Sequence, residues 1–199
     1  MKCPKCEFEN PDNAKFCNEC GHRLISPPEE PSSRPIPDAE RKRVTALFSD
    51  LSGYTAINEK LDPEEVRQIT GRIFDGIKAI VKRYEGFIEK FAGDGVLILF
   101  GVPRAHEDDP FRAIRAAQEI HHFVKALSPL YEVKIGRSMT MHSGINTGLV
   151  VSGEVDSQKG THTVTGDTIN VASRLSDLAE AEEILVGAET YKAANGRFT

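Results

Sequence analysis

Residues 46–55 read ALFSDLSGYT, a stretch that joins an apolar run to an acid and a turn. The run begins at Val44 and is typical of a buried strand, which we predict over residues 44–49. Asp50 follows at once, and a short helix is predicted over residues 55–61, after the turn. An acid at the carboxyl end of a strand, facing a turn that opens a helix, suits a sheet that holds a metal ion or a phosphate.

The composition is that of a globular protein. Of the 199 residues, 39% are hydrophobic and 28% are charged, and the length predicts one main domain with an appendage. A net charge of −5 gives no attraction to nucleic acid or to an anionic membrane. The chain starts without the apolar segment of a signal peptide, and its apolar runs are too short to span a bilayer. We therefore expect a cytoplasmic protein with neither nucleic acid nor membrane as a partner.

The cysteines predict a zinc site. All four lie within the first twenty residues, as Cys3, Cys6, Cys17 and Cys20. Two C-x2-C pairs separated by ten residues suit one tetrahedral Zn²⁺ held by four thiolates. The alternative, two disulfides in a secreted domain, is disfavoured because no export signal precedes them. We expect a short zinc ribbon over residues 1–24, which would derive most of its folding free energy from the metal.

The segment after the ribbon is rich in proline. Residues 25–39 read ISPPEEPSSRPIPDA and contain five prolines, which predict an extended, semi-rigid linker. Positive and negative charges cancel in the ribbon, so we expect a structural role, or docking of a protein or a domain, rather than binding of nucleic acid. Residues 40–199 are left for the main domain.

In the main domain, predicted strands and helices interleave. Asp62 and Pro63 suit the start of a long amphipathic helix that stops at Gly86, and Asp109-Pro110 suits the start of another. This α+β pattern predicts a mixed α/β sandwich with helices over one sheet. Strands are predicted over residues 44–49, 87–93, 95–101, 139–146, 161–165 and 183–187, and helices over 55–61, 63–85, 110–127, 169–179 and 189–194.

A second acid lies in a predicted turn. Asp94-Gly95 is favoured as a two-residue hairpin turn between apolar strands, because both positions need a positive φ. The tip of such a hairpin can bring Asp94 beside Asp50. Two carboxylates there repel each other unless a cation lies between them, and Mg²⁺ prefers a few protein oxygens together with phosphate oxygens. Each aspartate alone is typical of a turn or a cap, so the pair is what suggests a metal site.

Two further motifs suit a phosphorylated ligand. Asn170 and Arg174 are spaced i and i+4, so they share one face of the helix predicted over residues 169–179. An exposed polar face is the simpler explanation, but the guanidinium can stabilise charge on a transferring phosphoryl group. The turn after the first strand is a candidate phosphate site through the backbone N–H groups of Ser52, Gly53, Tyr54 and Thr55.

Four blocks together carry a family resemblance. FSDLSGYT, EKFAGDGVLILFG, GINTG and VTGDTINVASRL closely resemble, in order and spacing, the signature blocks of class III nucleotidyl cyclases over residues 42–199. The run FGVPRAHEDDPFRAIRAA is similar to the soluble-type bacterial adenylyl cyclases, which often carry an N-terminal zinc ribbon and downstream ATPase or repeat modules. The resemblance implies the ferredoxin-like sandwich of that family.

The resemblance also implies a two-metal reaction. Asp50 and Asp94, with the carbonyl of Leu51, would hold two Mg²⁺ or Mn²⁺ ions at each active site. One ion would activate the ribose 3′-hydroxyl and the other would hold the triphosphate. Asn170 would orient the ribose, and Arg174 would stabilise the transition state.

The base would be selected by Lys90 and Thr163. A lysine donates to N1 of adenine but opposes the N1–H of guanine, and guanylyl cyclases tend to have Glu and Cys at these positions. The resemblance therefore implies an adenylyl cyclase that makes cyclic AMP and pyrophosphate from ATP. It further implies a head-to-tail homodimer, in which the metal-binding acids of one protomer meet Lys90, Thr163, Asn170 and Arg174 of the other.

Three alternatives stay open. A guanylyl cyclase is opposed by Lys90. A module that senses a nucleotide without turnover is opposed by the retained Asp50 and Asp94. The resemblance implies that the family's last strands, with a lysine that binds the triphosphate, would follow Thr199, and their loss would favour such a module. The third alternative is a docking protein that uses the cyclase fold as a scaffold.

Overall fold

The computed structural model describes residues 1–11, 14–22, 24, 40–152 and 164–194. The chain divides into two compact units, Met1–Asp38 and Ala39–Thr199. Among the described residues, no helix is both long enough and apolar enough to cross a membrane. The predicted linker over residues 25–39 lies outside the described residues.

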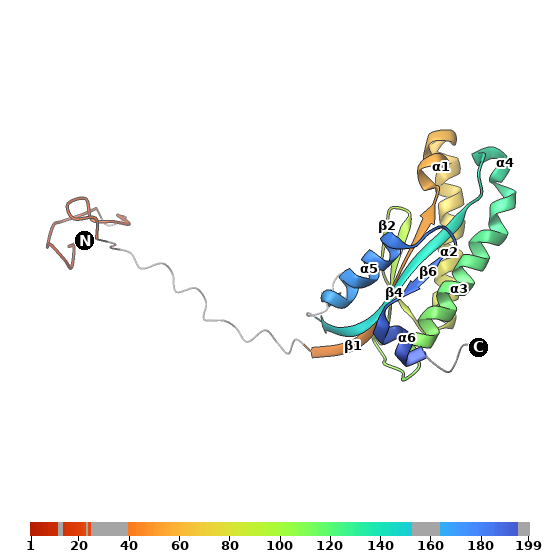
Figure 1. The fold of residues 1–199 in the computed structure, drawn as a ribbon. Coiled ribbons are helices and arrows are strands. Elements are labelled where there is room, and N and C mark those ends of the chain that lie inside the picture. Colours follow the sequence, from red (N-terminus) through yellow and green to blue (C-terminus); the bar gives the residue numbers. More distant parts are fainter. Residues whose placement is uncertain (12–13, 23, 25–39, 153–163, 195–199) are drawn as a thin grey trace. The chain divides into compact units, whose positions relative to one another are not determined.

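The larger unit is built on a six-stranded sheet (Figure 1). The strand order is β2-β3-β1-β4-β5, and β6 pairs with β4. Neighbouring strands are antiparallel except β4 and β6, which are parallel, so the sheet is mixed. The strands are β1 (Glu40–Ser52), β2 (Phe87–Ala92), β3 (Gly95–Phe100), β4 (Thr140–Ser152), β5 (Val164–Thr165) and β6 (Ile184–Val186).

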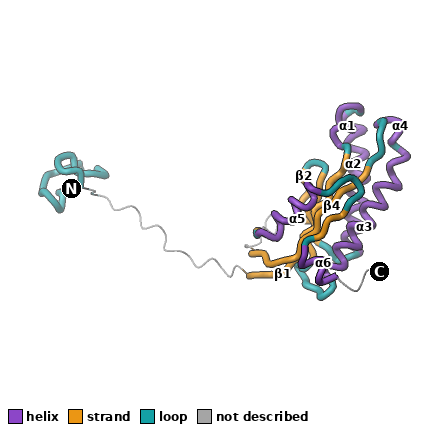
Figure 2. Tube along the Cα trace, viewed as in Figure 1, coloured by secondary structure: helices purple, strands orange, loops and turns teal. Residues whose placement is uncertain are grey.

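Helices cover this sheet (Figure 2), so the predicted mixed α/β sandwich is confirmed. The sequence patterns do not predict a short 3₁₀ turn, η1 (Ser128–Leu130), or the single helical turn that follows it. The α-helices are α1 (Tyr54–Lys60), α2 (Pro63–Arg83), α3 (Asp109–Leu127), α4 (Glu132–Ile135), α5 (Asp167–Leu178) and α6 (Ala188–Ala194).

The central strand β1 faces two hydrophobic clusters. Side chains alternate between the faces of a strand, so Leu47 and Leu51 join the cluster formed with α2 and α3. Val44 and Ala46 join the other cluster, to which α5 contributes Ala172. Asp50 shares the parity of Val44 and Ala46, so its side chain lies on the α5 face of the sheet.

β1 is longer than predicted. The sequence places the strand end at residue 49, before the acid, but β1 continues to Ser52. The cause is the long antiparallel partner β4, whose register with β1 runs without a break from Glu40↔Ser152 to Ser52↔Thr140. Asp50 therefore lies inside the strand, and its backbone is part of the ladder.

The start of α2 agrees with the sequence. Asp62 occupies the N-cap position and Pro63 is the first helical residue. The spacing of Asp62 and Glu65 also predicts a capping box, but the Asp62 side chain makes no capping hydrogen bond, and Glu65 pairs with Lys134 of α4 at 2.7 Å. The face that packs against the sheet consists of Val66, Ile69, Ile73, Ile77, Ile80 and Val81.

The end of α2 differs from the prediction. The helix ends at Arg83, and the left-handed residue after it is Glu85, with a φ of 58°, rather than Gly86. The N–H of Gly86 closes the end by donating to the carbonyl of Val81 at 3.0 Å, as in a Schellman motif. The Glu85 side chain forms an ion pair with Arg112 at 3.0 Å.

The β2–β3 turn and the start of α3 are each shifted by one residue from their predicted positions. The β2–β3 hairpin turns at Gly93 and Asp94, because Ala92 pairs with Gly95. Gly93 has a φ of 65°, whereas Asp94 does not have a positive φ, a pattern typical of a type II′ turn. α3 begins at Asp109, and its N-cap is Asp108. The buried carboxylate of Asp109 accepts a hydrogen bond from the backbone N–H of His106 in the preceding loop.

α5 sits unusually close to β4. A Cβ atom at Gly144 would collide with the carbonyl oxygen of Ala172 and the backbone nitrogen of Ser176. At Gly148 a Cβ would meet the side chain of Thr168, whose hydroxyl donates to a β4 carbonyl at 2.8 Å. The two glycines of β4 thus allow the backbone of α5 to contact the backbone of the sheet.

We predict that Gly144→Ala lowers the free energy of unfolding by about 3 kcal/mol, the upper end for overpacking, because the new methyl group meets backbone atoms that cannot rotate away. Gly71→Ala is the matched control. It lies in α2 with open space around its Cβ, so it should raise the free energy of unfolding by about 0.5–1 kcal/mol. Chemical denaturation measures both. Equal effects would show that the contact at Gly144 is not tight.

Candidate active site and zinc centre

Asp50 lies at a crowded position of the sheet. It pairs with Gly95 of β3 on one side and with His142 of β4 on the other. A Cβ at residue 95 would collide with Oδ1 of Asp50, so glycine leaves the space that this carboxylate fills. From α5, the hydroxyl of Ser176 donates to Oδ2 of Asp50 at 3.1 Å. The Asp50 side chain is therefore held between β3 and α5.

The hairpin tip brings Asp94 near Asp50, as the sequence predicts. Burial raises the pKa of Asp50 above its usual range, and the negative charges of Asp94 and Asp177 raise it further. The hydrogen bond from Ser176 and the nearby His142 act in the opposite direction on this pKa. Carboxylates thus gather at one end of the sheet, and a cation between them would relieve their repulsion.

The turn after β1 has the predicted strand–turn–helix form. Leu51 buries its side chain in the core, and because a leucine side chain carries no ligand atom, only its backbone carbonyl could contact a metal ion. Ser52 shares a hydrogen bond of 3.0 Å with Nδ1 of His142. Gly53 is the N-cap of α1 with a φ of 91°, and the guanidinium of Arg137 lies over it. Tyr54 and Thr55 form the first turn of α1.

The structure does not bring the Asn170/Arg174 pair toward Asp50 of the same chain. Ala172 and Ser176 are buried on the inward face of α5. Asn170 and Arg174 are exposed, and each lies two residues, or about 200° of helical rotation, from this inward face. They point away from the sheet that carries Asp50.

Of the two residues predicted to select the base, the structure describes only Lys90. Lys90 is exposed on β2 opposite Leu97, just after a bulge, and Leu97 in turn pairs with Phe48 of β1. Cross-strand neighbours share a face, so Lys90 lies on the α5 face, as Asp50 does. Thr163 lies outside the described residues, as does most of the strand predicted over residues 161–165.

Three neighbours of Asp50 were not recognised from the sequence: His142, Ser176 and Asp177. One signal for Ser176 was present, because it lies four residues after Ala172 on the apolar side of α5 and a polar residue there needs a buried partner. His142 and Asp177 carry no such signal, since their proximity to Asp50 depends on the β1–β4 register and on the packing of α5.

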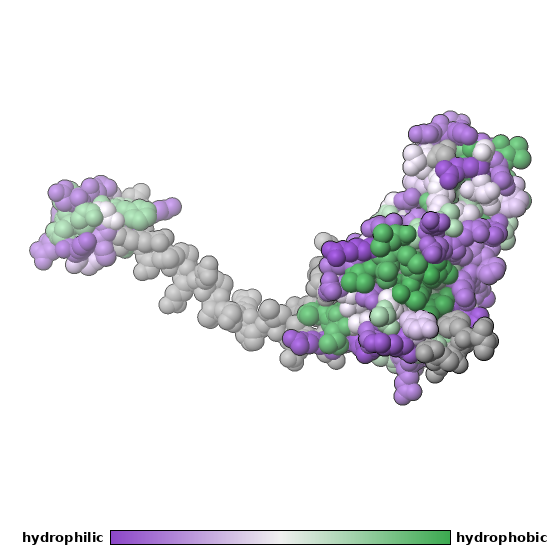
Figure 3. Space-filling model, viewed as in Figure 1, coloured by the Kyte–Doolittle hydropathy of each residue, from purple (hydrophilic) through white to green (hydrophobic). Residues whose placement is uncertain are grey.

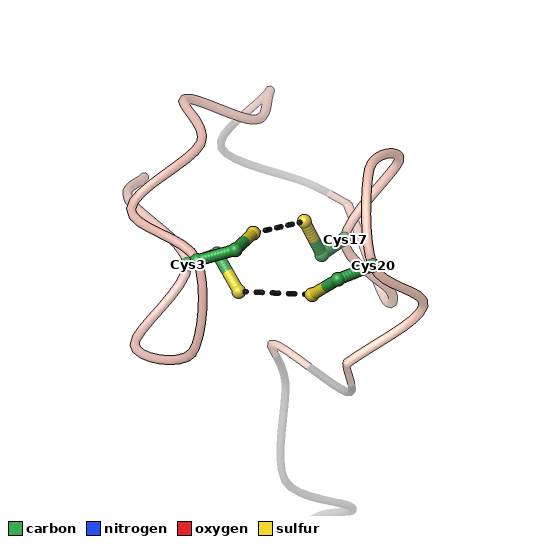
Figure 4. Close-up of side chains that lie close together, drawn as sticks. Cys3, Cys17 and Cys20 are labelled. Carbon is green, nitrogen blue, oxygen red and sulfur yellow. Dashed lines mark hydrogen bonds between the residues drawn. The ribbon is translucent and has the colours of Figure 1, made fainter.

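In the ribbon, the four cysteines form one cluster (Figure 4). The sulfur atoms of Cys3 and Cys20 are 3.7 Å apart, and those of Cys6 and Cys17 are 3.6 Å apart. All four lie within 4.8 Å of one another. Tetrahedral Zn²⁺ with Zn–S bonds of about 2.3 Å places its sulfurs about 3.8 Å apart. The donor set and its spacing therefore fit the predicted zinc ion.

The two cysteine loops repeat one backbone pattern. The N–H of Glu7 donates to the carbonyl of Cys3, and the N–H of Gly21 donates to the carbonyl of Cys17, both at 2.9 Å. Glu7 and Gly21 both have positive φ, 60° and 69°. Asn10, which no sequence motif marks, is buried and donates to Sγ of Cys17 at 3.5 Å. Such contacts orient a thiolate toward a metal.

Comparison with protein families agrees with both units. The family described as "Adenylate and Guanylate cyclase catalytic domain" matches residues 36–199. The chain belongs to this family. A zinc-ribbon domain family matches residues 2–24. The class III cyclase resemblance and the N-terminal zinc ribbon are thus confirmed.

Relatives of this cyclase domain include both nucleotide specificities. Adenylate cyclase 1 of Rhizobium meliloti (strain 1021) is 33% identical over 141 residues, which are 70% of this chain and 21% of that protein. The crystal structure of the adenylyl cyclase CyaB from P. aeruginosa has a TM-score of 0.73 and 31% identity, and covers 78% of this chain and 81% of that chain. The guanylyl cyclase Cya2 has a TM-score of 0.73 and 32% identity, with 80% and 81% covered. The chain spans between 21% and 29% of the length of the first curated relatives it matches.

The raised pKa of Asp50 predicts a pH-dependent cost to stability. The folded state binds this proton more tightly than the unfolded state does, so stability falls as pH rises from 3.8 through the raised pKa. Asp50→Asn should therefore raise the thermal midpoint of the metal-free cyclase domain at pH 7, and the gain should shrink as pH approaches 4. Asp75→Asn, at an exposed ion pair with Lys78, is the control and should change little. A lower midpoint for Asp50→Asn at pH 7 would contradict the prediction.

The ribbon should bind one zinc per chain. Metal analysis should give a one-to-one ratio, and Cys17→Ser should increase amide exchange in residues 1–24 because the metal supplies the folding free energy. The cyclase domain should keep its thermal midpoint, since it is a separate compact unit. Protein that is zinc-free and carries disulfides between these cysteines would contradict the prediction.

Proposed function

We propose that this chain is an adenylyl cyclase domain, which converts ATP to cyclic AMP and pyrophosphate. The observation that carries the proposal is that Asp50, near the end of β1, lies close to Asp94 in the β2–β3 turn, within a cyclase-family fold. Burial and neighbouring acids make an unaccompanied charge at Asp50 unfavourable, which supports a site built for cations.

Asp50 and Asp94, with the carbonyl of Leu51, would hold two Mg²⁺ or Mn²⁺ ions. These ions would activate the ribose 3′-hydroxyl and neutralise charge on the triphosphate. Asn170 would orient the ribose through its side-chain amide. Arg174 would stabilise charge at the α-phosphate through its planar guanidinium. Backbone N–H groups of the turn at residues 52–55 would contribute to phosphate binding.

The site would be completed by a second copy of the chain. Asn170 and Arg174 are exposed on the outward face of α5, away from Asp50 of their own protomer. Figure 3 shows apolar side chains gathered on the surface over α5 and β6, and Leu178 at the end of α5 is exposed. An exposed apolar surface beside charged residues supports an interface, so a two-fold homodimer with shared sites is favoured.

The choice of ATP is argued from Lys90. Its exposed ammonium group can donate to N1 of adenine, whereas the N1–H of guanine would meet it as a second donor. Thr163 would complete the selection. The similarity to the guanylyl cyclase Cya2 is as great as that to CyaB, so a guanylyl cyclase is the second candidate. A module that binds nucleotide without turnover is the third.

The organisation supported best is a ribbon over residues 1–24, a linker over residues 25–39 and a cyclase domain over residues 40–199. The zinc would be structural. Two phenylalanines of the ribbon, Phe8 and Phe16, are 43% and 55% exposed, which favours docking of a protein or domain. A cytoplasmic location remains our expectation.

Product analysis of the chain with Mn²⁺ and ATP or GTP tests the proposal, with binding of each nucleotide measured alongside. Lys90→Glu combined with Thr163→Cys should change the ratio of ATP to GTP affinity by roughly 100-fold toward GTP, because the donor and acceptor pattern is reversed. Lys82→Glu, the same charge change on the exposed side of α2, should leave the ratio unchanged.

The outcomes separate the candidates. Cyclic AMP as the main product supports the proposal, and cyclic GMP would assign the second candidate. Tight nucleotide binding without product would favour the sensing module. A double variant that keeps the full ATP preference would mean that residues 90 and 163 do not select the base.

A further inference from the structure

We propose that Ser176 is a positioning residue that orients the Asp50 carboxylate for metal binding. The inference rests on the proposed function, because it takes Asp50 as a metal ligand. Its basis is a single contact, in which the hydroxyl of Ser176 donates to Oδ2 of Asp50 at 3.1 Å.

The contact is built into the fold. Ser176 is 1% exposed, and its backbone nitrogen lies against Gly144 of β4, where no Cβ fits. α5 therefore cannot move outward or rotate freely without losing its packing on the sheet. The hydroxyl is delivered to Asp50 by a rigid helix, so it can fix the orientation of the carboxylate.

The choice of oxygen matters for the metal. Ser176 occupies Oδ2, while Oδ1 lies over Gly95, next to the hairpin tip that carries Asp94. A carboxylate has lone pairs on both oxygens, so one oxygen can accept the hydroxyl while the other faces a cation. The hydroxyl leaves the negative charge of Asp50 intact, whereas a lysine or arginine there would neutralise it.

The hydroxyl of Ser176 does not use the acceptor that its own helix offers. Buried serine and threonine in a helix commonly donate to the carbonyl four residues earlier. Thr70 of α2 does so, bonding to the carbonyl of Val66 at 2.8 Å. The hydroxyl of Ser176 instead bridges α5 to β1 across 126 residues of sequence. The Ser176 hydroxyl thus donates its hydrogen bond to Asp50 rather than to its own helix.

The test is a titration of zinc-loaded chain with Mn²⁺ alone, in which the sharp magnetic resonance signal of free Mn²⁺ reports binding. Zinc loading keeps the ribbon thiolates occupied. Ser176→Ala should weaken Mn²⁺ binding roughly tenfold, as removal of outer-shell hydrogen bonds typically does. Ser176→Thr, which keeps the hydroxyl, should restore most of the affinity. Ser173→Ala on the same helix is the matched control and should bind as wild type does.

A double-mutant cycle separates positioning from general damage to the fold. If Ser176 acts through Asp50, adding Ser176→Ala to Asp50→Asn should weaken Mn²⁺ binding no further. An equal further loss in the Asp50→Asn background would overturn the inference and assign Ser176 a structural role. Thermal midpoints of all variants, measured without Mn²⁺, check that the fold is retained.

Failure of the inference and failure of the proposed function look different. If Asp50→Asn weakens Mn²⁺ binding but Ser176→Ala does not, Asp50 is a ligand and only the role of Ser176 is wrong. If Asp50→Asn binds Mn²⁺ as wild type does, or wild type does not bind it, the metal assignment of Asp50 is wrong, and the inference is overturned with it.

Discussion

The backbone contact between α5 and β4 at Gly144 governs the geometry of the candidate site. Without a side chain there, the helix lies against the sheet itself, and Ser176 comes within hydrogen-bonding distance of Asp50. The same contact decides which face of α5 is inward. Asn170 and Arg174 are exposed because the residues two positions away are pressed onto the strands. One glycine thus determines both what Asp50 contacts and what the domain presents outward.

Without a bound cation, the carboxylates of Asp50, Asp94 and Asp177 repel one another at one end of the sheet. Burial and the charges of Asp94 and Asp177 disfavour ionisation of Asp50, and the opposing contacts from Ser176 and His142 do not cancel this effect. Folding places these acids together because the hydrophobic clusters on both faces of β1 fix the register of its neighbours. Stability is lost locally, and a cation bound as proposed would restore it, as expected where function and stability conflict.

The sequence predicts most of the fold because its signals are local. Apolar periodicity and capping residues identify α2, and the apolar run identifies β1, although pairing with β4 extends that strand beyond the residue where the pattern stops. Asp50 and Asp94 are predicted as a pair because an acid after an apolar run and an acid beside a turn glycine are local signals, and these signals survive although the strand end and the turn are each displaced in the structure. The contact from Ser176 depends on how closely a helix approaches a sheet, which no local pattern reports. Similarly, Glu85 rather than Gly86 takes the left-handed position at the end of α2, and its side chain pairs with Arg112, a residue distant in sequence.

In the proposed dimer, α5 belongs to two active sites at once. Its inward face contacts Asp50 of its own protomer through Ser176, and its outward face presents Asn170 and Arg174 to the nucleotide bound by the other. The backbone of α5 lies directly against Gly144, so in this dimer a shift imposed on the outward face would also move the end of the helix that contacts Asp50. Nucleotide at one site and metal at the other would then be coupled through a single helix. Such coupling is reciprocal, so a variant that loosens the Ser176–Asp50 contact should also alter how the partner's nucleotide is held.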